Sequence, residues 1–588
     1  MSRPFSALLA VSVCFVAVLG YFWLGEPPSN QELLANSAKV ADYVRSASSV
    51  GGIPWWTSSY LQGCSLSFFS YTALTNLGLF LGSLAAGPYA GPKLAALAFL
   101  LLCPLTMYAF VRRLCTGSGW LAFASGCAYL FAPGLLLRAG HVEHVSIVMA
   151  FAMLPLAFLG VLVFLEDRTP RSALLCAIGN AVLVLAYAKI ALLILPLLAA
   201  FALWALAARS HFELPSWRMI GLCLGAFFLL AVVPNLPATR EMAFVAGFDF
   251  GPFAGWQRAF SAESVLAWID RESWFSGYPG SSQNTIRTTG SYLGMVGLAC
   301  VAALFFLRAR PVWQSPEATT FRLFLALALL AQWLSFGVHS ALTAQFAFLG
   351  RAGEAQDFAI AISWALFVLQ GAVLFMIIPG SLPAKPWLAS LAIVVYFLVP
   401  GFKILEKLPL YGDIRAPQDF FQVGGVFCFA IAAGIAAVLV IREFPWPAIR
   451  PAAAVLIIAV AAADSALCVH AIFRSPIDRS TFADFLEAQE FLAKSTVPGR
   501  VYPYSGRYFY LLTPELSGRG LATEAFNSYL AQREIGRLQQ ASVESKSSLL
   551  TFLKIAGVSY LLIDKNDPDT PQSLQDTLRP LFQTAYEN

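Results

Sequence analysis

The sequence predicts a polytopic α-helical membrane protein of about thirteen spans, followed by a small extracytoplasmic C-terminal α/β domain. Composition is the first reason: 58% of the 588 residues are hydrophobic and 12% are charged, about half the charged fraction of a soluble protein. The second is a mean hydropathy of +0.69. The third is that many apolar runs are long enough to cross a bilayer, whereas the composition from about residue 471 onward is that of a soluble domain.

Charge and cysteine usage exclude several classes of protein. The formal net charge of +5 is small for so long a chain, and the basic residues are scattered between apolar runs, so we expect no nucleic-acid partner. Most of the ten cysteines lie inside apolar runs, where a thiol packs as a small hydrophobic group. Neither a disulfide framework nor a CxxC metal site is predicted.

The first apolar run, residues 5–24, is predicted to be a retained transmembrane helix with its amino terminus in the cytoplasm. It follows Arg3, is longer than the core of a usual signal peptide, and ends in Tyr21-Phe22-Trp23 rather than in a small-residue cleavage site. A long polar segment, residues 26–67, comes next. Loops of this length in compact proteins are often functional.

The apolar piece at residues 68–84 is interrupted by Asn76, Gly78 and Gly82 and is predicted to lie in the membrane interface. If it crossed the bilayer, Arg112 and Arg113 at the end of the next span would fall outside the cell. If it does not cross, the span 94–111 delivers both arginines to the cytoplasm, as the excess of basic residues in cytoplasmic loops requires.

The remaining spans follow from the same rule. The outward-running spans are predicted at residues 120–137, 172–188, 219–233, 323–338, 387–400 and 452–467. The inward-running spans are predicted at residues 145–165, 190–208, 292–307, 358–378 and 420–441. The membrane domain therefore covers residues 1–470, with long outer loops at 26–67 and 234–290, and the protein is placed in the inner (plasma) membrane. Lys189, Arg351 and Arg415 are exceptions, because they fall at outer ends.

Residues 471–588 are predicted to form the extracytoplasmic α/β domain. Helices are expected at residues 480–495, 547–555 and 571–581, and short strands at 500–503 and 559–563. Acidic and basic residues nearly balance in this segment. It contains no Gly-rich phosphate loop and no Ser-His-Asp spacing.

The short polar stretch from Gly140 to His144 stands between two apolar runs and holds two of the five histidines. Ionisable groups beside a membrane are often functional. His141, Glu143 and His144 are candidate ligands of a divalent cation, Mg²⁺ or Mn²⁺, but three ligands in one turn with no distant partner are weak evidence for a metal site. The other interpretation is a polar cap on two helix ends.

Carboxylates and cations are both predicted on the outer face. A carboxylate there can act as a general base toward an acceptor hydroxyl, whereas a phosphate leaving group needs cations. The candidate carboxylates are Glu26, Glu32, Asp42 and Glu143, and the candidate phosphate-binding cations are Lys189, Arg351 and Arg415. The three cations are also expected as headgroup anchors. Trp55 and Trp56 are interfacial belt residues or, alternatively, sugar-stacking residues.

Several short motifs occur in the order found in a known family. They are the first span followed by Gly52-Ile53-Pro54-Trp55-Trp56, the Arg138-Ala139-Gly140-His141-Val142-Glu143 turn, Thr289-Gly290-Ser291-Tyr292-Leu293-Gly294, Arg415-Ala416-Pro417, and Arg500-Val501-Tyr502-Pro503 with Gly557-Val558-Ser559-Tyr560-Leu561-Leu562. In this order the chain resembles the bacterial GT-C membrane glycosyltransferases, in particular the YfhO-like and related branch. Nearly the whole chain takes part in the resemblance.

This resemblance implies transfer of a hexosyl or pentosyl group on the outer face, from a polyprenyl-phosphate-linked sugar to a lipid, glycan or protein acceptor. It also implies a catalytic Asp early in the first outer loop, where this chain has none before Asp42. Glu32 best matches the expected spacing before Trp55, followed by Glu26 and then Asp42. The resemblance further implies a tail that continues beyond Asn588.

Two other classes of protein remain open. A non-catalytic membrane scaffold for envelope glycan assembly would account for the missing Asp. A lipid or solute transporter would also have many spans, but its charges are expected near the middle of the membrane, at broken helices and symmetric repeats. In this chain the charges are predicted at the outer edge. The convergence of Glu32 or Glu26, Glu143 and a cation on one outer cavity would favour the transferase.

Overall fold

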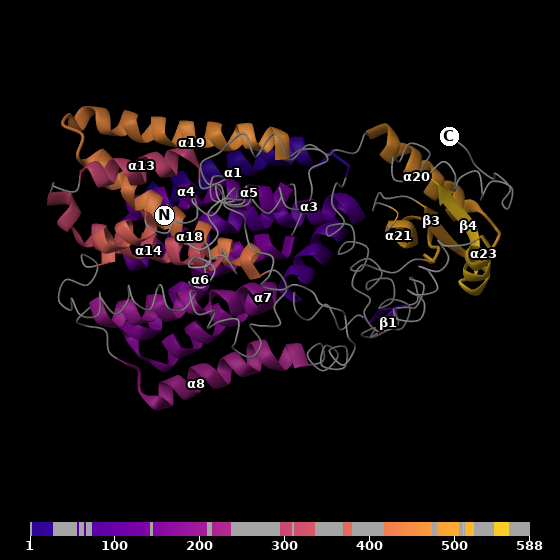
Figure 1. Cartoon of the computed structure of the whole chain (residues 1–588), viewed down its shortest axis with the longest axis horizontal. Helices are drawn as coiled ribbons and strands as arrows, with labels where there is room; N and C mark the ends of the chain where they lie inside the picture. The colour runs from indigo at the N-terminus through magenta and orange to yellow at the C-terminus, as the bar shows by residue number, and fades with distance from the viewer. Residues whose placement is uncertain are drawn as a thin grey trace, which may run out of the picture.

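The computed structural model is a bundle of long helices with a small mixed α/β unit at one end (Figure 1). The structure describes residues 3–27, 56–57, 64–65, 73–140, 145–208, 214–236, 294–307, 311–335, 369–378, 417–472, 479–504, 510, 512–522 and 546–563. Within these residues, seven helices are long and apolar enough to cross a membrane, and the bent pair α4 and α5 makes up to eight. The protein is an integral membrane protein; the count of thirteen spans stays a prediction.

The helices of the bundle have the following bounds: α1 Arg3–Trp23, α3 Ala73–Leu114, α4 Gly119–Leu130, α5 Pro133–Gly140, α6 Val145–Asp167, α7 Pro170–Ala208, α8 Trp217–Phe227, α13 Met295–Phe306, α14 Pro316–Ser335, α18 Pro417–Arg442 and α19 Arg450–Ile472. A π-helical turn, η2 Phe228–Val232, continues α8, and the 3-10 turns η3 Pro311–Gln314 and η5 Pro447–Ile449 precede α14 and α19. The strands β1 Trp56–Thr57 and β2 Cys64–Ser65 pair antiparallel.

The core lies where six helices meet around a cluster of aromatic rings. Phe110 of α3 is within 6.1 Å, ring centre to ring centre, of Phe158 of α6, Phe201 of α7, Phe324 of α14 and Phe427 of α18. Tyr129 of α4 contacts the same cluster through Phe427. Four of these five ring pairs are edge-to-face and the pair of Phe110 with Phe427 is stacked. Both arrangements add to the energy of burial, so these six helices form the centre of the bundle.

The helix α3 is a hairpin rather than one straight rod. Its backbone leaves the helical region at Gly87, with φ 80°, and Gly82 lies so close to Gly91 that a Cβ on either would meet the other's backbone at 2.4 Å or less. Residues 73–87 therefore run back along the span Ala90–Leu114. One side of this segment packs on the next helix, and Leu77, Leu81 and Leu84 on it are more than half exposed. That it lies in the membrane interface stays a prediction.

The helix α7 is also two segments, which turn back at Tyr187. The Cβ of Gly179 in the first segment would touch the backbone of Leu156 in α6, and the ring of Phe201 in the second segment lies 5.2 Å from that of Phe158. Both segments thus pass α6 at the same level, although a straight helix would separate residues 179 and 201 by about 33 Å. This agrees with the predicted reversal beside Lys189.

Ion pairs join helix ends that the sequence placed on one side of the membrane. Arg113 at the end of α3 pairs with Glu166 and Asp167 at the end of α6, at 2.9 and 3.2 Å. Arg442 at the end of α18 pairs with Glu317 at the start of α14, at 3.2 Å. These residues share one end of the bundle, as the predicted span directions require. That this end faces the cytoplasm stays a prediction.

The helix α14 packs antiparallel on α18 along its length. The Glu317 pair lies at one end, and Gly425 of α18 faces Ala331 near the other. Polar side chains of α14 are buried: Arg322 donates to the carbonyl of Trp313 at 2.6 Å and its guanidinium lies 4.7 Å from the centre of that indole ring. Gln332 is buried as well. Helix α14 is not among the seven strongly apolar helices.

Two helices lie at the periphery of the bundle, α8 and α19, at opposite edges in Figure 1. Only 11% of the most apolar window of each is buried, against 83% for α18. Helix α8 docks through a small cluster in which Met219, Ile220 and Cys223 contact Phe164 and Cys176. The surfaces left exposed are apolar, as expected for helices that face lipid.

The C-terminal unit consists of helices around a two-stranded parallel sheet. Its elements are α20 Arg479–Lys494, β3 Arg500–Tyr504, α21 Thr513–Ser517, α23 Lys546–Ile555 and β4 Val558–Ile563. Strand β3 pairs with β4, Val501 opposite Tyr560, and α20 packs Phe482, Phe485 and Leu492 onto Val501 and Leu521. These helices and strands agree with those expected at 480–495, 500–503, 547–555 and 559–563; residues 571–581 lie outside the described residues, and the domain boundary stays a prediction.

A close contact between α4 and α18 makes a direct test of this packing. A Cβ on Gly434 would lie 2.5 Å from both the nitrogen and Cα of Ser125, so we expect Gly434→Ala to lower stability by about 2 kcal/mol, as overpacking does. Thermal unfolding in detergent measures it. Gly221→Ala in α8 is the matched control, because nothing lies within 4 Å of its Cβ. Equal unfolding midpoints for the two variants would contradict the packing.

Candidate functional site

The end of α1 is built around a fully buried lysine. Lys93 has no exposed surface, and its ammonium donates to the carbonyls of Trp23 at 3.2 Å and of Glu26 at 2.7 Å. It also lies 5.5 Å from the centre of the Trp23 indole. The last carbonyls of a helix lack partners within the helix, and a cation there is favourable. Lys93 thus caps α1 and determines where the chain leaves it.

Glu26 connects this corner to the C-terminal unit. Its carboxylate oxygen Oε1 accepts from Arg479, the first residue of α20, at 2.7 Å. The glutamate side chain is 16% exposed and the arginine side chain 70%. We call Trp23, Glu26, Lys93 and Arg479 the α1 corner. The long loop predicted to follow α1 therefore starts at a residue whose main chain and side chain are both held.

The pair α4 and α5 forms a second polar corner at the predicted outer side. The two helices meet at an angle of 45°, at Pro133, which disfavours a helical conformation of the residue before it. Ser465 of α19 donates its hydroxyl to the carbonyl of Phe131 at 2.8 Å. Next to it, Asp464 accepts from the backbone N–H of Met295, the first residue of α13, at 3.3 Å.

Arg138 belongs to this second corner. It lies in α5, three residues before His141, and is only 7% exposed. A buried guanidinium keeps its charge and its five N–H donors, so Arg138 brings a cation close in sequence to the candidate ligands His141, Glu143 and His144.

The turn of α7 places Lys189 beside the hairpin of α3. The hydroxyl of Thr75 donates to the carbonyl of Ala186 at 3.0 Å, immediately before the turn at Tyr187. Lys189 follows and is half-buried. Both segments of α7 run from this turn into the core. Lys189 therefore lies at the turn that joins the two segments, and the sequence predicts that this turn faces outward.

Most of the predicted site residues lie outside the described residues. These are Glu32, Asp42, Trp55, His141, Glu143, His144, Arg351 and Arg415. Trp56 is placed in β1, opposite Ser65. Glu26 and Lys189 are fully described, Glu26 in the α1 corner and Lys189 at the turn of α7. The predicted convergence of Glu143 and Glu32 stays a prediction.

Besides Arg322 of α14, three buried charged residues at the two corners were missed by the sequence analysis: Lys93, Arg138 and Asp464. Each had a detectable signal. Asp464 is the one acid within the apolar run 452–467, whereas Lys93 and Arg138 directly border the runs 94–111 and 120–137. A charged residue within or beside a span is a functional or structural candidate by default, and in this structure all three hold helix ends or lie next to one.

A metal centre is not found within the part of the chain that the structure describes, where no three His, Cys, Asp or Glu residues gather to hold an ion. The candidate ligands His141, Glu143 and His144 lie outside that part.

Comparisons with known proteins found similar solved structures only. No family model and no curated protein matches the chain. The arabinofuranosyltransferase AftD from Mycobacteria is 14% identical over 89% of this chain and 32% of its own, with a TM-score of 0.44. ArnT from Cupriavidus metallidurans bound to undecaprenyl phosphate is 15% identical over 94% of this chain and 90% of its own, with a TM-score of 0.42.

A third similar structure is the Archaeoglobus fulgidus oligosaccharyltransferase tethered with an acceptor peptide, 12% identical over 95% of this chain and 68% of its own, with a TM-score of 0.44. The chain spans about a third of the length of AftD. At these identities and TM-scores the likeness assigns the chain neither a family nor an activity.

Proposed function

We propose that this protein is a membrane glycosyltransferase that moves a sugar from a polyprenyl-phosphate donor to an acceptor hydroxyl on the outer face of the cytoplasmic membrane. The observation that carries the proposal is the α1 corner. Buried Lys93 binds the main-chain carbonyl of Glu26, and Arg479 pairs with its carboxylate. The position of Glu26 is therefore fixed at the start of the loop that carries the candidate base Glu32. Catalysis requires such positioning of the reacting groups.

The proposed reaction is a single displacement with inversion at the anomeric carbon. The acceptor oxygen forms a bond to that carbon while the bond from the carbon to the phosphate oxygen breaks. A carboxylate takes the proton of the acceptor hydroxyl, and polyprenyl phosphate leaves with the electron pair. We assign the base to Glu32. Glu26 is the less suitable choice, because its carboxylate is paired with Arg479.

Cations are required to stabilise the leaving phosphate. We assign this role to Lys189 and Arg415, and Glu143 with His141 or His144 would position the acceptor. Lys189 lies at the turn of α7, and buried Arg138 adds a cation three residues before His141. Alternatively, Glu143 with His141 or His144 would hold a divalent cation, which would supply further stabilisation of the phosphate charge.

Transfer assays with purified protein test the proposal. The wild type is incubated with labelled polyprenyl-phosphate sugars and acceptors of each class, with and without a chelator. We expect Glu32→Gln to lower transfer by about a hundredfold or more, the usual contribution of a general base. Glu143→Gln should lower it by about a hundredfold through the loss of acceptor positioning. Glu490→Gln is the control, because that side chain is 74% exposed in α20. Transfer by Glu143→Gln at the wild-type rate would remove Glu143 from the chemistry.

The alternative is a non-catalytic scaffold for envelope glycan assembly, for which the missing early Asp is the specific observation. A scaffold would bind polyprenyl-phosphate sugars but form no product with any acceptor, and the variants would not differ from the wild type in this assay. Product formation that depends on Glu32 distinguishes the enzyme from the scaffold.

A further inference from the structure

Helix α19 makes polar contacts with the bundle at its two ends. At one end Arg450 donates through Nε and Nη2 to the carbonyl of Phe444, at 3.3 and 3.1 Å. At the other end Asp464 and Ser465 bind the backbone of Met295 and Phe131. Only 11% of the most apolar window of this helix is buried. Along its middle, partly buried side chains contact the core, namely Ile457, Ile458, Ala461 and Ala462, and the polar contacts hold its ends.

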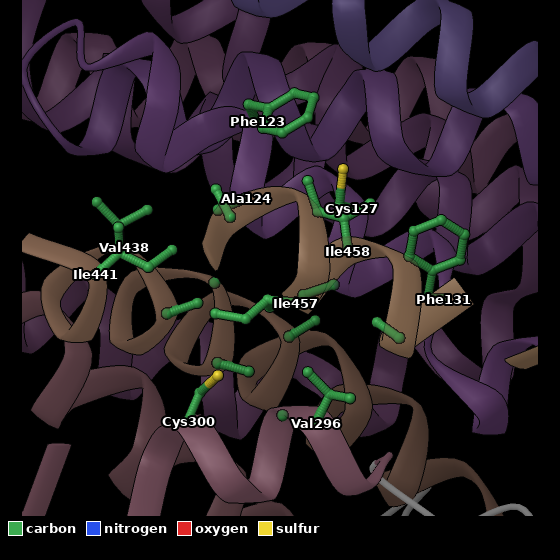
Figure 2. Close-up of a pocket in the computed structure, with 18 of the residues that line it drawn as sticks. Phe123, Ala124, Cys127, Phe131, Val296, Cys300, Val438, Ile441, Ile457 and Ile458 are labelled. Atoms are coloured by element: carbon green, nitrogen blue, oxygen red, sulfur yellow. The ribbon is translucent and has the colours of Figure 1, made fainter. Parts of the chain in front are cut away.

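An apolar groove of about 690 Å³ lies beneath the middle of α19, within the range of ligand-binding pockets. In Figure 2, Phe123 and Cys127 of α4 lie across the open space from Val296 and Cys300 of α13. Helices α18 and α19 complete the lining. Small residues of α18 line the groove, namely Ala430, Ala433, Gly434 and Ala437.

The two ends of the groove differ in charge. Arg442 and Arg450 line one end and Asp464 lines the other. Trp120, also in the lining, is 60% exposed and Trp446 is 65% exposed, and tryptophans of this kind collect at the level of lipid headgroups. The arginine end therefore lies where a headgroup phosphate would be, and the groove runs from there into the membrane.

We propose that this groove binds an acyl chain of an anionic glycerophospholipid, whose phosphate is bound by Arg442 and Arg450. From residue 450 to residue 464 the helix spans roughly 20 Å, which exceeds the half-thickness of about 15 Å of a hydrocarbon core. The lining between the charged ends is apolar, so an extended hydrocarbon chain fits it and a polar solute does not.

The arginines can bind a phosphate in addition to their present partners. Among the contacts that the structure describes, Arg442 uses Nη1 for Glu317, and Arg450 uses Nε and Nη2 for one carbonyl. A guanidinium has five N–H donors, and it binds phosphate with two parallel hydrogen bonds. The phosphate-binding end of this site, at Arg442 and Arg450, lies at the end of the groove opposite to Asp464, and the proposal does not depend on the proposed transferase activity.

Lipid titration of the purified full-length protein, followed by native mass spectrometry, tests the site. The probes are phosphatidylglycerol and phosphatidylcholine with identical acyl chains. We expect the wild type to prefer phosphatidylglycerol and Arg450→Gln to lose about fivefold of that preference, the usual contribution of one basic residue near an anionic headgroup. Arg450→Lys should keep most of it. Equal binding of both lipids by the wild type would overturn the proposal.

The acyl-chain part of the site is tested by filling the groove. Ala454 lines it, whereas Ala459 lies on the exposed side of the same helix. Ala454→Phe should weaken both lipids at least fivefold, and Ala459→Phe should bind them as the wild type does. Equal thermal unfolding midpoints of the two variants would show that neither substitution displaces α19 from the bundle. Wild-type binding by Ala454→Phe, or displacement of phosphatidylglycerol by an equal amount of polyprenyl phosphate, would overturn the assignment.

Discussion

Replacing Lys93 by methionine is expected to lower stability by about 3 kcal/mol, because the carbonyls of Trp23 and Glu26 lose the charged donor that joins them. The Trp23 carbonyl keeps the N–H of Glu26 as a donor, at 3.1 Å. The contact with the Trp23 indole is lost as well. If the proposed function is correct, transfer should fall by about a hundredfold, since small displacements of a loop with a catalytic base have effects of that size. Thermal unfolding in detergent and the transfer assay measure the two effects.

Lys494→Met is the matched control for this substitution. The Lys494 side chain is 79% exposed and, among the residues that the structure describes, pairs with Glu490, one turn earlier in α20, at 3.5 Å. Exposed pairs of this kind contribute little, so its unfolding and its transfer rate should match the wild type. If Lys93→Met also unfolds like the wild type, the lysine does not hold the end of α1.

Replacing Arg519 by methionine is expected to destabilise the C-terminal unit by about 4 kcal/mol. Its guanidinium donates to the carbonyls of Leu492 at 2.7 Å, of Ser495 at 2.5 Å and of Val497 at 2.6 Å, where α20 ends. It also lies 4.7 Å from the centre of the Tyr560 ring on β4. Hydrogen bonds from a charged donor are among the stronger ones. Hydrogen exchange of the α20 amides measures the loss.

Two further variants distinguish the hydrogen bonds of Arg519 from its charge. Arg519→Lys keeps the charge but not the planar arrangement of donors, so protection of α20 should be intermediate. Lys554→Met removes an exposed cation of α23 and should leave exchange unchanged. Fast exchange throughout α20 in the Lys554→Met variant would show that the unit responds to any loss of charge, and not to the loss of the helix cap.

Apolar runs predicted the individual helices well. The spans expected at 5–24, 94–111, 145–165 and 420–441 all appear with ends within a few residues, because lipid demands about twenty apolar residues wherever a helix crosses. Hydropathy does not reveal where a run is bent. The fold of residues 73–87 onto the following span depends on the contact between Gly82 and Gly91, which a single sequence does not show.

Pairing between distant segments could not be predicted either. The strands at 500–503 and 559–563 were expected, but residue periodicity within each strand does not reveal that they pair with each other or that they are parallel. The same is true of the candidate site. Glu26 was selected as an acid near the first span, but its partner Arg479 follows it by 453 positions, and nothing in the spacing indicates that they meet.

Buried charges were the weakest part of the sequence analysis. Lys93 directly precedes the predicted span 94–111 and was not selected; a lysine beside an apolar run usually extends to water. In the structure it turns inward, because the carbonyls at the end of α1 compensate its charge. Burial of an ionisable group depends on its partners, and partners become visible only when the helices are packed.

The polar face of α14 has a consequence for how the protein is made. Arg322 and Gln332 are buried in the bundle, and a helix with such residues is expensive to leave in lipid by itself. Its antiparallel partner α18 is synthesised later, after residues 336–416. We therefore expect α14 to stay close to the insertion machinery, or packed on helices already inserted, until α18 is inserted. The last helices of the bundle then insert together with their packing partners and not one by one.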